Sequence, residues 1–341
     1  MYPIDFSDDI PEIKVCPSTL SEGFNTYSPA ACRLLFGSRK ISHIFNGVNP
    51  RWDSRDAKKP FENIGKISLS GVQQKFSAAL GDDNQLHFCA EGSRGKYILK
   101  PNPSGYHLFN RAYCAANENL TMQIASQVYG ISAAANGLCF FVDGEPAYFT
   151  RRFDVSGEGK YAQEDFASLL GYTKANGGSD YKYCNSSYEE CAEVIRKYVK
   201  PYPVDLLRFF QLILFNFITL NDDAHLKNFS LINRDGEYRL SPAYDLSNTS
   251  LHLGQPRIFA LERGLFREGM SFSDTRTISR EDFIEFGKRT GLPEKLVKRG
   301  IDRFAAPSDA VSRLVGNSFL SEELKKEYLG GLTYRQSMLR L

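Results

Sequence analysis

The chain has 341 residues, of which 42% are hydrophobic and 24% are charged, and 42 Lys and Arg nearly balance 40 Asp and Glu. This composition is typical of a folded protein with two domains or two lobes, and it excludes a disordered tail or a collagen-like fibre. A net charge of +2 supplies no strongly basic face for wrapping nucleic acid, so direct DNA contact is not expected.

The cysteines and the apolar runs favour a cytoplasmic protein without membrane contact. Seven cysteines without C-x-x-C spacing predict neither a disulfide framework nor a zinc ribbon, and free thiols suit a reducing compartment. The first residues, MYPIDFSDDIPE, lack the pattern of a secretory signal. The most apolar run, 206–220, is too short to span a bilayer of about 30 Å and is predicted to be a buried helix.

The first half of the chain is predicted to be rich in β-structure. A short helix is expected at 29–36, followed by β-rich runs separated by Gly, Asp and Asn turns. These runs cover 66–71, 76–80, 85–90 and 96–100. The segment 110–129 has apolar residues at helical spacing and ends at Gly130, and a hairpin is expected over 137–153.

Beyond Phe153 the pattern becomes mainly helical. One hairpin interrupts it at 229–240, where Asp235-Gly236 favours a type I′ turn. We therefore expect a short N-terminal extension over 1–64, a β-rich lobe with one helix over 65–153, and a helical lobe over 154–341.

The stretch 221–245 contains a pattern suited to phosphoryl transfer. Asp223 and Asn228 have the spacing of the catalytic Asp and the Mg²⁺-binding Asn of protein kinases, and Asp245 follows a hairpin that can return it to the same cleft. Lys227, between them, can neutralise developing phosphoryl charge. On spacing alone, the acidic and amide residues also fit turns and caps, and His225 also fits a structural histidine.

Upstream residues could complete such a site. Lys100 ends a predicted strand, and Glu118 on the next predicted helix could pair with it. The segment 68–75, SLSGVQQK, could cover phosphates with its backbone N–H groups. Taken singly, Lys100 also fits a solvated strand end, Glu118 also fits an exposed helix face, and the segment 68–75 also fits an ordinary hairpin. The chain lacks G-x-x-x-x-G-K-[ST], HRD and DFG, which excludes a P-loop NTPase and a conventional protein kinase.

Together these motifs resemble the HipA family of bacterial serine/threonine kinases, the toxins of HipA/HipB modules. The matching pieces are SLSGVQQK (68–75), YILKP (97–101), the Asn117-Glu118 pair, RRFD (151–154), AQED (162–165), NDDAHLKNFSL (221–231) and SPAYDL (241–246). The resemblance implies an α+β, two-lobed, protein-kinase-like fold with a β-rich N-lobe and a mainly helical C-lobe. It also implies ATP and Mg²⁺ as cofactors.

The resemblance assigns roles to individual residues. It implies that Asp223 is the catalytic base, that Asn228 and Asp245 bind Mg²⁺, and that Lys100 orients the ATP phosphates. The other implied nucleotide-binding residues are Ser70, Gly71, Val72, Gln73, Lys75, Arg152, Phe153, Gln163, His225, Lys227 and Tyr244.

The resemblance also implies regulation and partners. Family kinases are switched off by autophosphorylation of a serine in the Gly-rich loop, so Ser68, Ser70 or both are expected to be modified. This S-x-S arrangement is similar to the compact HipT branch, in which a small separate protein, HipS, supplies an N-terminal subdomain. We expect a HipB-like antitoxin, a HipS-like protein and a protein substrate, such as an aminoacyl-tRNA synthetase, with DNA contacted only through the antitoxin.

Two departures from the family pattern are Arg151, where long HipA has an acidic residue, and Leu220-Asn221, where Gly-Asn is usual. Two other functions stay open at this point. One is a nucleotide-binding pseudokinase that acts as a scaffold for an antitoxin–DNA complex, and the other is a small-molecule kinase with the same cleft.

Overall fold

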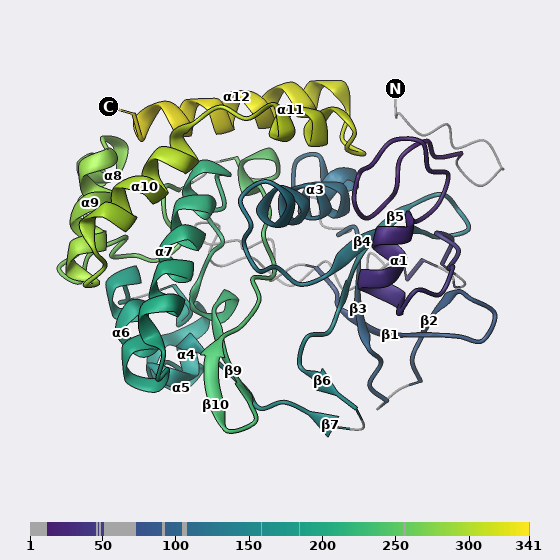
Figure 1. Cartoon of the computed structure of the whole chain (residues 1–341), viewed down its shortest axis with the longest axis horizontal. Helices are drawn as coiled ribbons and strands as arrows, with labels where there is room; N and C mark the ends of the chain where they lie inside the picture. Colours follow the sequence, from purple (N-terminus) through teal and green to yellow (C-terminus); the bar gives the residue numbers. More distant parts are fainter. Residues whose placement is uncertain are drawn as a thin grey trace.

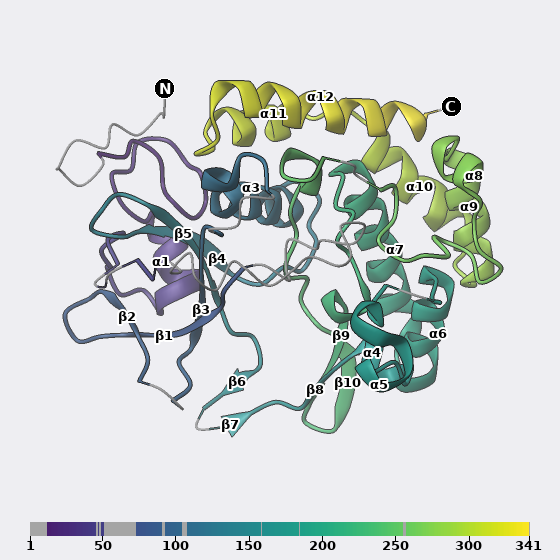
Figure 2. The same ribbon diagram turned by 180° about the vertical axis from the view of Figure 1, so that it is seen from behind.

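The computed structural model describes residues 12–45, 47, 49–50, 73–90, 93–103, 108–157, 159–183, 185–254 and 257–340. A smaller lobe built on a sheet lies beside a larger, mainly helical lobe, and both views agree on this arrangement (Figures 1 and 2). The loop residues Ser68, Ser70, Gly71 and Val72, and the strand expected at 66–71, lie outside the described residues.

The smaller lobe contains a five-stranded antiparallel sheet with the strand order β2-β1-β3-β5-β4. Its strands are β1 (Phe76–Leu80), β2 (Leu86–Phe88), β3 (Tyr97–Pro101), β4 (Asn136–Phe140) and β5 (Pro146–Arg151). The strands predicted at 76–80, 85–90 and 96–100 and the hairpin at 137–153 are thus confirmed. Lys100 pairs with Tyr148 in the central strands, so the backbone that carries the lysine is held on both sides.

The segment before the sheet forms part of the same lobe. The predicted helix α1 (Pro29–Phe36) begins after Ser28, whose hydroxyl accepts a bond from Ala31 N, and ends at Gly37 with φ +62°. Its Phe36 ring stacks on Phe149 of β5, with ring centroids 5.9 Å apart. Burial of this aromatic face joins the helix to the sheet.

Helix α3 (Cys114–Gln127), preceded by the 3-10 turn η3 (Arg111–Tyr113), lies between the two lobes (Figure 1). It confirms the helix predicted at 110–129. Unusually, many of its polar side chains are buried, which is costly unless they are hydrogen-bonded. Asn117 donates to Asn248 O at 2.7 Å, and Thr121 bonds to Tyr328 OH at 2.9 Å. These bonds fix the helix to the larger lobe.

The larger lobe is built around α7 (Tyr202–Ile218), the buried helix that the sequence predicts. Around it lie α4 (Phe166–Leu169), α5 (Lys174–Gly177), η4 (Gly178–Asp180), α6 (Tyr188–Tyr198), α8 (Phe272–Arg276), α9 (Arg280–Arg289) and α10 (Glu294–Ala305). Helices α11 (Asp309–Gly316) and α12 (Glu322–Met338) run across α3 and α7 and so span both lobes (Figures 1 and 2). No helix within the described ranges has the length and apolar character needed to cross a membrane.

The predicted hairpin is present as β9 (Ser230–Arg234) and β10 (Glu237–Leu240). Asp235 and Gly236 both have positive φ, 54° and 86°, as a type I′ turn requires. The expectation of only one hairpin in this part was incomplete, because β6 (Val155–Ser156), β7 (Gly159–Lys160) and β8 (Gln163–Asp165) precede it. Strands of two or three residues are too short to produce an alternating pattern. β8 pairs with β9 and so joins AQED to the predicted catalytic loop.

The thiols agree with the sequence-based prediction. All six cysteines that the structure describes, Cys16, Cys32, Cys89, Cys114, Cys139 and Cys191, are free.

Candidate active site

A cavity of about 420 Å³ opens between the lobes. It is lined by strand β3, the segment after β5, strand β8, the loop around η5 (Leu226–Asn228) and the turn after β10. The predicted site residues that line it are Lys75, Lys100, Arg152, Phe153, Gln163, His225, Lys227, Asn228, Tyr244 and Asp245. Segments that are distant in sequence thus contribute to one cavity.

A buried ion cluster joins the two lobes at this cavity. Lys100 Nζ lies 2.6 Å from Glu118 Oε1 on α3 and also donates to Asp245 Oδ1, while Lys75 Nζ lies 3.1 Å from Asp245 Oδ2. Burial alone would lower the pKa of Lys100, but the carboxylates of Asp245 and Glu118 outweigh it and raise that pKa. Burial would raise the pKa of Asp245, and the two lysines reverse this and lower it. Burial is the main cause that raises the pKa of Glu118, and the charge of Lys100 opposes that shift. The ionised core of the cluster is therefore the pair Lys100 and Asp245.

The backbone holds Asp245 in an unusual conformation. Its φ of 55° lies in the left-handed region, where Asp is tolerated better than most residues but still has a conformational cost. Two backbone bonds secure the chain just before it: Ala243 N donates to Ser132 O at 2.7 Å, and Ala134 N donates to Ala243 O at 2.9 Å. This local anchoring maintains the turn that directs the carboxylate toward Lys100.

Asn228 and Asp245 are the two predicted metal ligands, and they lie next to each other. Asn228 Nδ2 lies 3.5 Å from Asp245 Oδ2, and Asn228 Oδ1 accepts the backbone N–H of His225 at 3.2 Å. Among the described residues no cluster of three or more His, Cys, Asp or Glu could hold a metal. A Mg²⁺ ion needs only one or two protein oxygen ligands when waters and phosphate oxygens complete its shell. The carboxylate of Asp245 fits this role, whereas Asn228 would have to turn its amide oxygen away from His225 N to serve as the second ligand.

His225 is a buried histidine at the wall of the cavity. Burial is the main cause that lowers its pKa, to about 3, and nearby Lys182 adds to the effect. Within the described residues neither of its ring nitrogens has a hydrogen-bond partner. A neutral imidazole offers one donor and one acceptor, so the side chain can bond to a polar ligand in the cavity.

Asp223 lies beside the cavity rather than on its wall. Its side chain is buried, and its Oδ1 accepts a hydrogen bond of 2.5 Å from Tyr183 OH. Sequence reasoning missed Tyr183 and also Lys182, which lines the cavity. The two lie 40 residues or more before Asp223, in a segment without a recognisable motif, and no local signal could have identified them.

One side of the cavity is formed by residues 151–154, the segment at the end of β5 that leads into the larger lobe, and we call it the hinge side. This side is aromatic and hydrogen-bonded. The Phe153 and Tyr244 rings face one another with centroids 5.8 Å apart, and Tyr244 OH donates to Lys227 O at 2.8 Å. Arg152 forms two bonds with Asp154, of 3.0 and 2.7 Å.

The remaining predicted residues are also fixed by partners. Gln163 Nε2 donates to Ser230 Oγ at 2.9 Å, and Lys227 forms an ion pair with Asp165. Gln73 is directed elsewhere, because its Nε2 donates to Pro101 O at 3.1 Å and the residue does not line the cavity. The wall of the cavity carries Lys75, Lys100, Lys182 and Lys227. This basic lining suits a polyanion.

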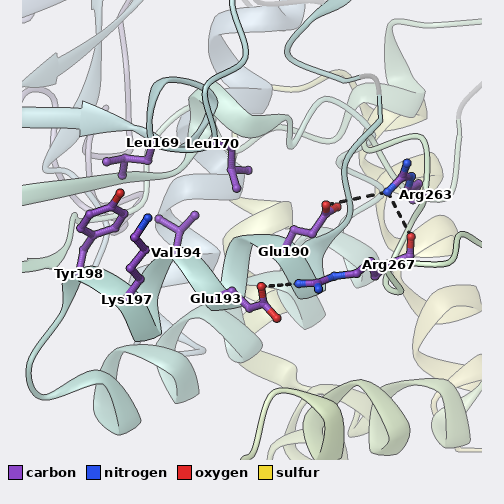
Figure 3. Close-up of a pocket in the computed structure, with 9 residues that line it drawn as sticks. All are labelled: Leu169, Leu170, Glu190, Glu193, Val194, Lys197, Tyr198, Arg263 and Arg267. Atoms are coloured by element: carbon purple, nitrogen blue, oxygen red, sulfur yellow. Dashed lines mark hydrogen bonds and ion pairs between the residues drawn. The ribbon is translucent and has the colours of Figure 1, made fainter.

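A second hollow, of about 370 Å³, lies between α4, α6 and the loop 263–267 (Figure 3). Four of its charged side chains form two pairs: Arg263 lies 3.9 Å from Glu190, and Arg267 forms an ion pair with Glu193. None of the predicted site residues that the structure describes lines this groove. The candidate chemistry therefore belongs to the cleft.

The fold is that of two-lobed, kinase-like proteins. HipA from Shewanella oneidensis, solved in a complex with HipB and operator DNA, superposes with a TM-score of 0.61 at 21% identity, over 83% of this chain and 67% of that one. The Helicobacter pylori proinflammatory kinase CtkA gives a TM-score of 0.51 at 15% identity, over 77% of this chain and 93% of that one. At these identities the similarity concerns the fold, and it confirms the predicted fold class.

Residues 67–311 match the model of the HipA-like C-terminal domain, and this protein belongs to that family. A Haemophilus influenzae protein named "Putative kinase" is 28% identical over 285 residues, which cover 77% of this chain and 79% of the relative. "Putative kinase Y4dM" of Sinorhizobium fredii is 29% identical over 270 residues, covering 73% of this chain and 60% of the relative. The resemblance to HipA inferred from the motifs is thus confirmed.

Proposed function

We propose that this protein is an ATP- and Mg²⁺-dependent kinase that phosphorylates Ser or Thr hydroxyls of a protein. The observation that carries the proposal is the buried Lys100–Glu118–Asp245 cluster in a cleft lined by lysines. Kinases use such a strand lysine, held by a helix glutamate, to orient ATP phosphates, and an aspartate from the other lobe to bind metal. Membership of a family whose relatives carry the name kinase supports the same conclusion.

Each group in the cleft has a proposed task. Lys100 and Lys75 bind the phosphates, and Asn228 and Asp245 supply oxygen ligands for Mg²⁺. When bound, Mg²⁺ neutralises charge on the β- and γ-phosphates. Asp223 accepts the proton of the substrate hydroxyl as that oxygen attacks the γ-phosphorus.

The remaining predicted residues form the nucleotide-side wall. We propose that Phe153 and Tyr244 contact the adenine, with Arg152 and Gln163 beside it, because these residues line the hinge side of the same cavity. We propose that His225 and Lys227 lie beside the phosphates, with Ser70, Gly71 and Val72 in the loop that covers them.

Regulation and partners are proposed from the family. The HipA structure that resembles this chain contains HipB and operator DNA, and we propose a HipB-like antitoxin here, with DNA contacted through it. We further propose autophosphorylation at Ser68 or Ser70, a small HipS-like partner, a cytoplasmic location and an aminoacyl-tRNA synthetase as the class of target. The divisions 1–64, 65–153 and 154–341 are proposed as the extension, the N-lobe and the C-lobe.

The test is phosphate transfer from radiolabelled ATP by the purified chain, compared with its D223A variant. We expect the wild type to incorporate phosphate at Ser68 or Ser70, as located by mass spectrometry, and the variant to bind a fluorescent ATP analogue without transfer. Binding without transfer by the wild type would indicate a pseudokinase. Turnover that requires a metabolite extract, with no phosphate on protein, would indicate a small-molecule kinase.

A further inference from the structure

Tyr183 is held tightly against the predicted catalytic loop. Its hydroxyl donates to Asp223 Oδ1 at 2.5 Å, and its side chain is buried. The adjacent backbone is bonded on both sides: Leu226 N donates to Lys182 O at 3.1 Å, and Glu262 N donates to Tyr183 O at 3.0 Å. The phenol therefore occupies a fixed position relative to the loop.

The ring of Tyr183 also contacts two groups of the cleft. It meets the His225 ring edge to face, with centroids 5.0 Å apart and an interplanar angle of 75°. Lys182 Nζ lies 5.0 Å from the Tyr183 ring centroid. These contacts restrict the rotation of the ring and direct its hydroxyl to one carboxylate oxygen.

We infer that Tyr183 is a positioning residue that holds the Asp223 carboxylate in the orientation needed to accept a proton from the substrate hydroxyl. The inference rests on the proposed function. An ionised carboxylate has about four lone-pair sites on two oxygens, so it can accept from a tyrosine and from a substrate together. A bond to a charged acceptor is short and strong, which suits a fixed rather than a mobile base.

The proton balance leaves Tyr183 chemically unchanged. The substrate oxygen forms a bond to the γ-phosphorus as the bond between that phosphorus and the β,γ-bridging oxygen breaks, and ADP leaves. The hydroxyl proton passes to Asp223. Tyr183 keeps its own proton throughout and contributes only the orientation of the acceptor.

The experiment compares Y183F with a matched control, Y188F. Tyr188 is also buried, and its hydroxyl donates to Ala224 O at 2.9 Å, so its single hydroxyl proton goes to the backbone of the same loop instead of to the Asp223 carboxylate. In single-turnover autophosphorylation with radiolabelled ATP, we expect Y183F to be slowed about 10- to 100-fold, the equivalent of one lost bond to a charged group. We expect Y188F to be slowed less than about threefold. The affinity for a fluorescent ATP analogue should be unchanged in Y183F.

A double-variant comparison separates positioning from general stability. If Tyr183 acts through Asp223, then D223N and D223N/Y183F will have the same residual rate within about twofold, because the group being oriented is already lost. A further loss in the double variant, or an equal loss in Y188F and Y183F, would overturn the inference.

A second readout does not depend on catalysis. The ¹³C carboxyl resonance of Asp223, assigned by its loss in D223N, should titrate at higher pH in Y183F than in the wild type, because the hydrogen bond favours the ionised form. An unchanged titration would refute the contact. If the wild type transfers no phosphate, the proposed function fails while this measurement still decides the role of Tyr183 in orienting the carboxylate.

Discussion

The cleft between the lobes and the groove between α4 and α6 have similar volumes, about 420 and 370 Å³, but their ion pairs differ in exposure to solvent. In the cleft, the Lys100 and Glu118 side chains are 4% and 6% exposed. In the groove, the Arg267 and Glu193 side chains are 49% and 56% exposed (Figure 3). The same type of ion pair is thus buried in one place and solvated in the other.

This difference in exposure shows that the charged groups of the cleft are retained at a cost in desolvation free energy. A solvated pair costs little to form and contributes little, typically below about 1 kcal/mol. A buried pair must overcome the desolvation of both groups, and a hydrophobic replacement is often at least as stable. Burial of a lysine and two carboxylates at a cavity is therefore weak evidence for stability and stronger evidence for a site that handles charged ligands.

The largest expected effect is at Asp245. D245N keeps the size of the side chain but removes its charge, so Lys100 and Lys75 lose an anionic partner and the proposed metal site loses a ligand. We expect phosphate transfer to fall about 10³-fold or more, as when a strong electrostatic contact to a transferred phosphoryl group is lost. A radiolabelled-ATP assay measures the loss, and circular dichroism controls for folding. Transfer within tenfold of the wild type would contradict the proposed metal site.

A smaller effect on phosphate transfer is expected at Glu118 in the cleft, with Glu193 in the groove as the comparison. E118Q removes the charge that fixes Lys100, and we expect transfer to slow about 10- to 100-fold, because one charge-assisted bond is lost. E193Q in the groove is the matched control and should leave transfer unchanged and cost less than about 1 kcal/mol of unfolding free energy. Equal effects of the two substitutions on transfer would remove the contrast between the cleft and the groove.

The smallest expected effect is on folding stability and concerns His252, a buried histidine behind the cleft. His252 Nδ1 bonds to Phe109 O at 3.0 Å and its Nε2 lies 2.8 Å from Asn117 Nδ2, so the neutral ring donates at one nitrogen and accepts at the other. Burial is the main cause that lowers its pKa to about 4, while the bond to Phe109 O opposes the shift. Because the unfolded chain binds the proton near its ordinary pKa of about 6.5, the native state loses stability as pH falls from about 6.5 toward 4.

This loss can be measured by denaturant unfolding at two pH values. Between pH 7.5 and about pH 5 we expect His252 to account for about 2 kcal/mol of the lost stability, and H252Q should lack that component. If H252Q loses as much stability with acid as the wild type does, the buried neutral histidine is not the cause.

Local patterns along the chain predicted much of the fold and the family. The β-rich runs of β1 and β3 between turn residues, the helical spacing around Glu118 and the Asp235-Gly236 turn depend on neighbouring residues, so they can be recognised without the tertiary structure. The very short strands β6, β7 and β8 escaped prediction for the same reason, because two or three residues contain no period. The roles of the matched site residues remain predictions.

The sequence by itself determined the candidate groups, namely Lys100, Glu118, Asp223, Asn228 and Asp245, because their chemistry and short spacings belong to the primary structure. Only the tertiary structure decided which of them meet: Asp245 reaches Lys100 across 145 residues, and Tyr183 reaches Asp223 across 40. Contacts over such separations depend on the packing of two lobes around α3 and on the left-handed backbone at Asp245. No local pattern encodes that geometry, because it depends on how side chains from the whole chain are buried together in the folded protein.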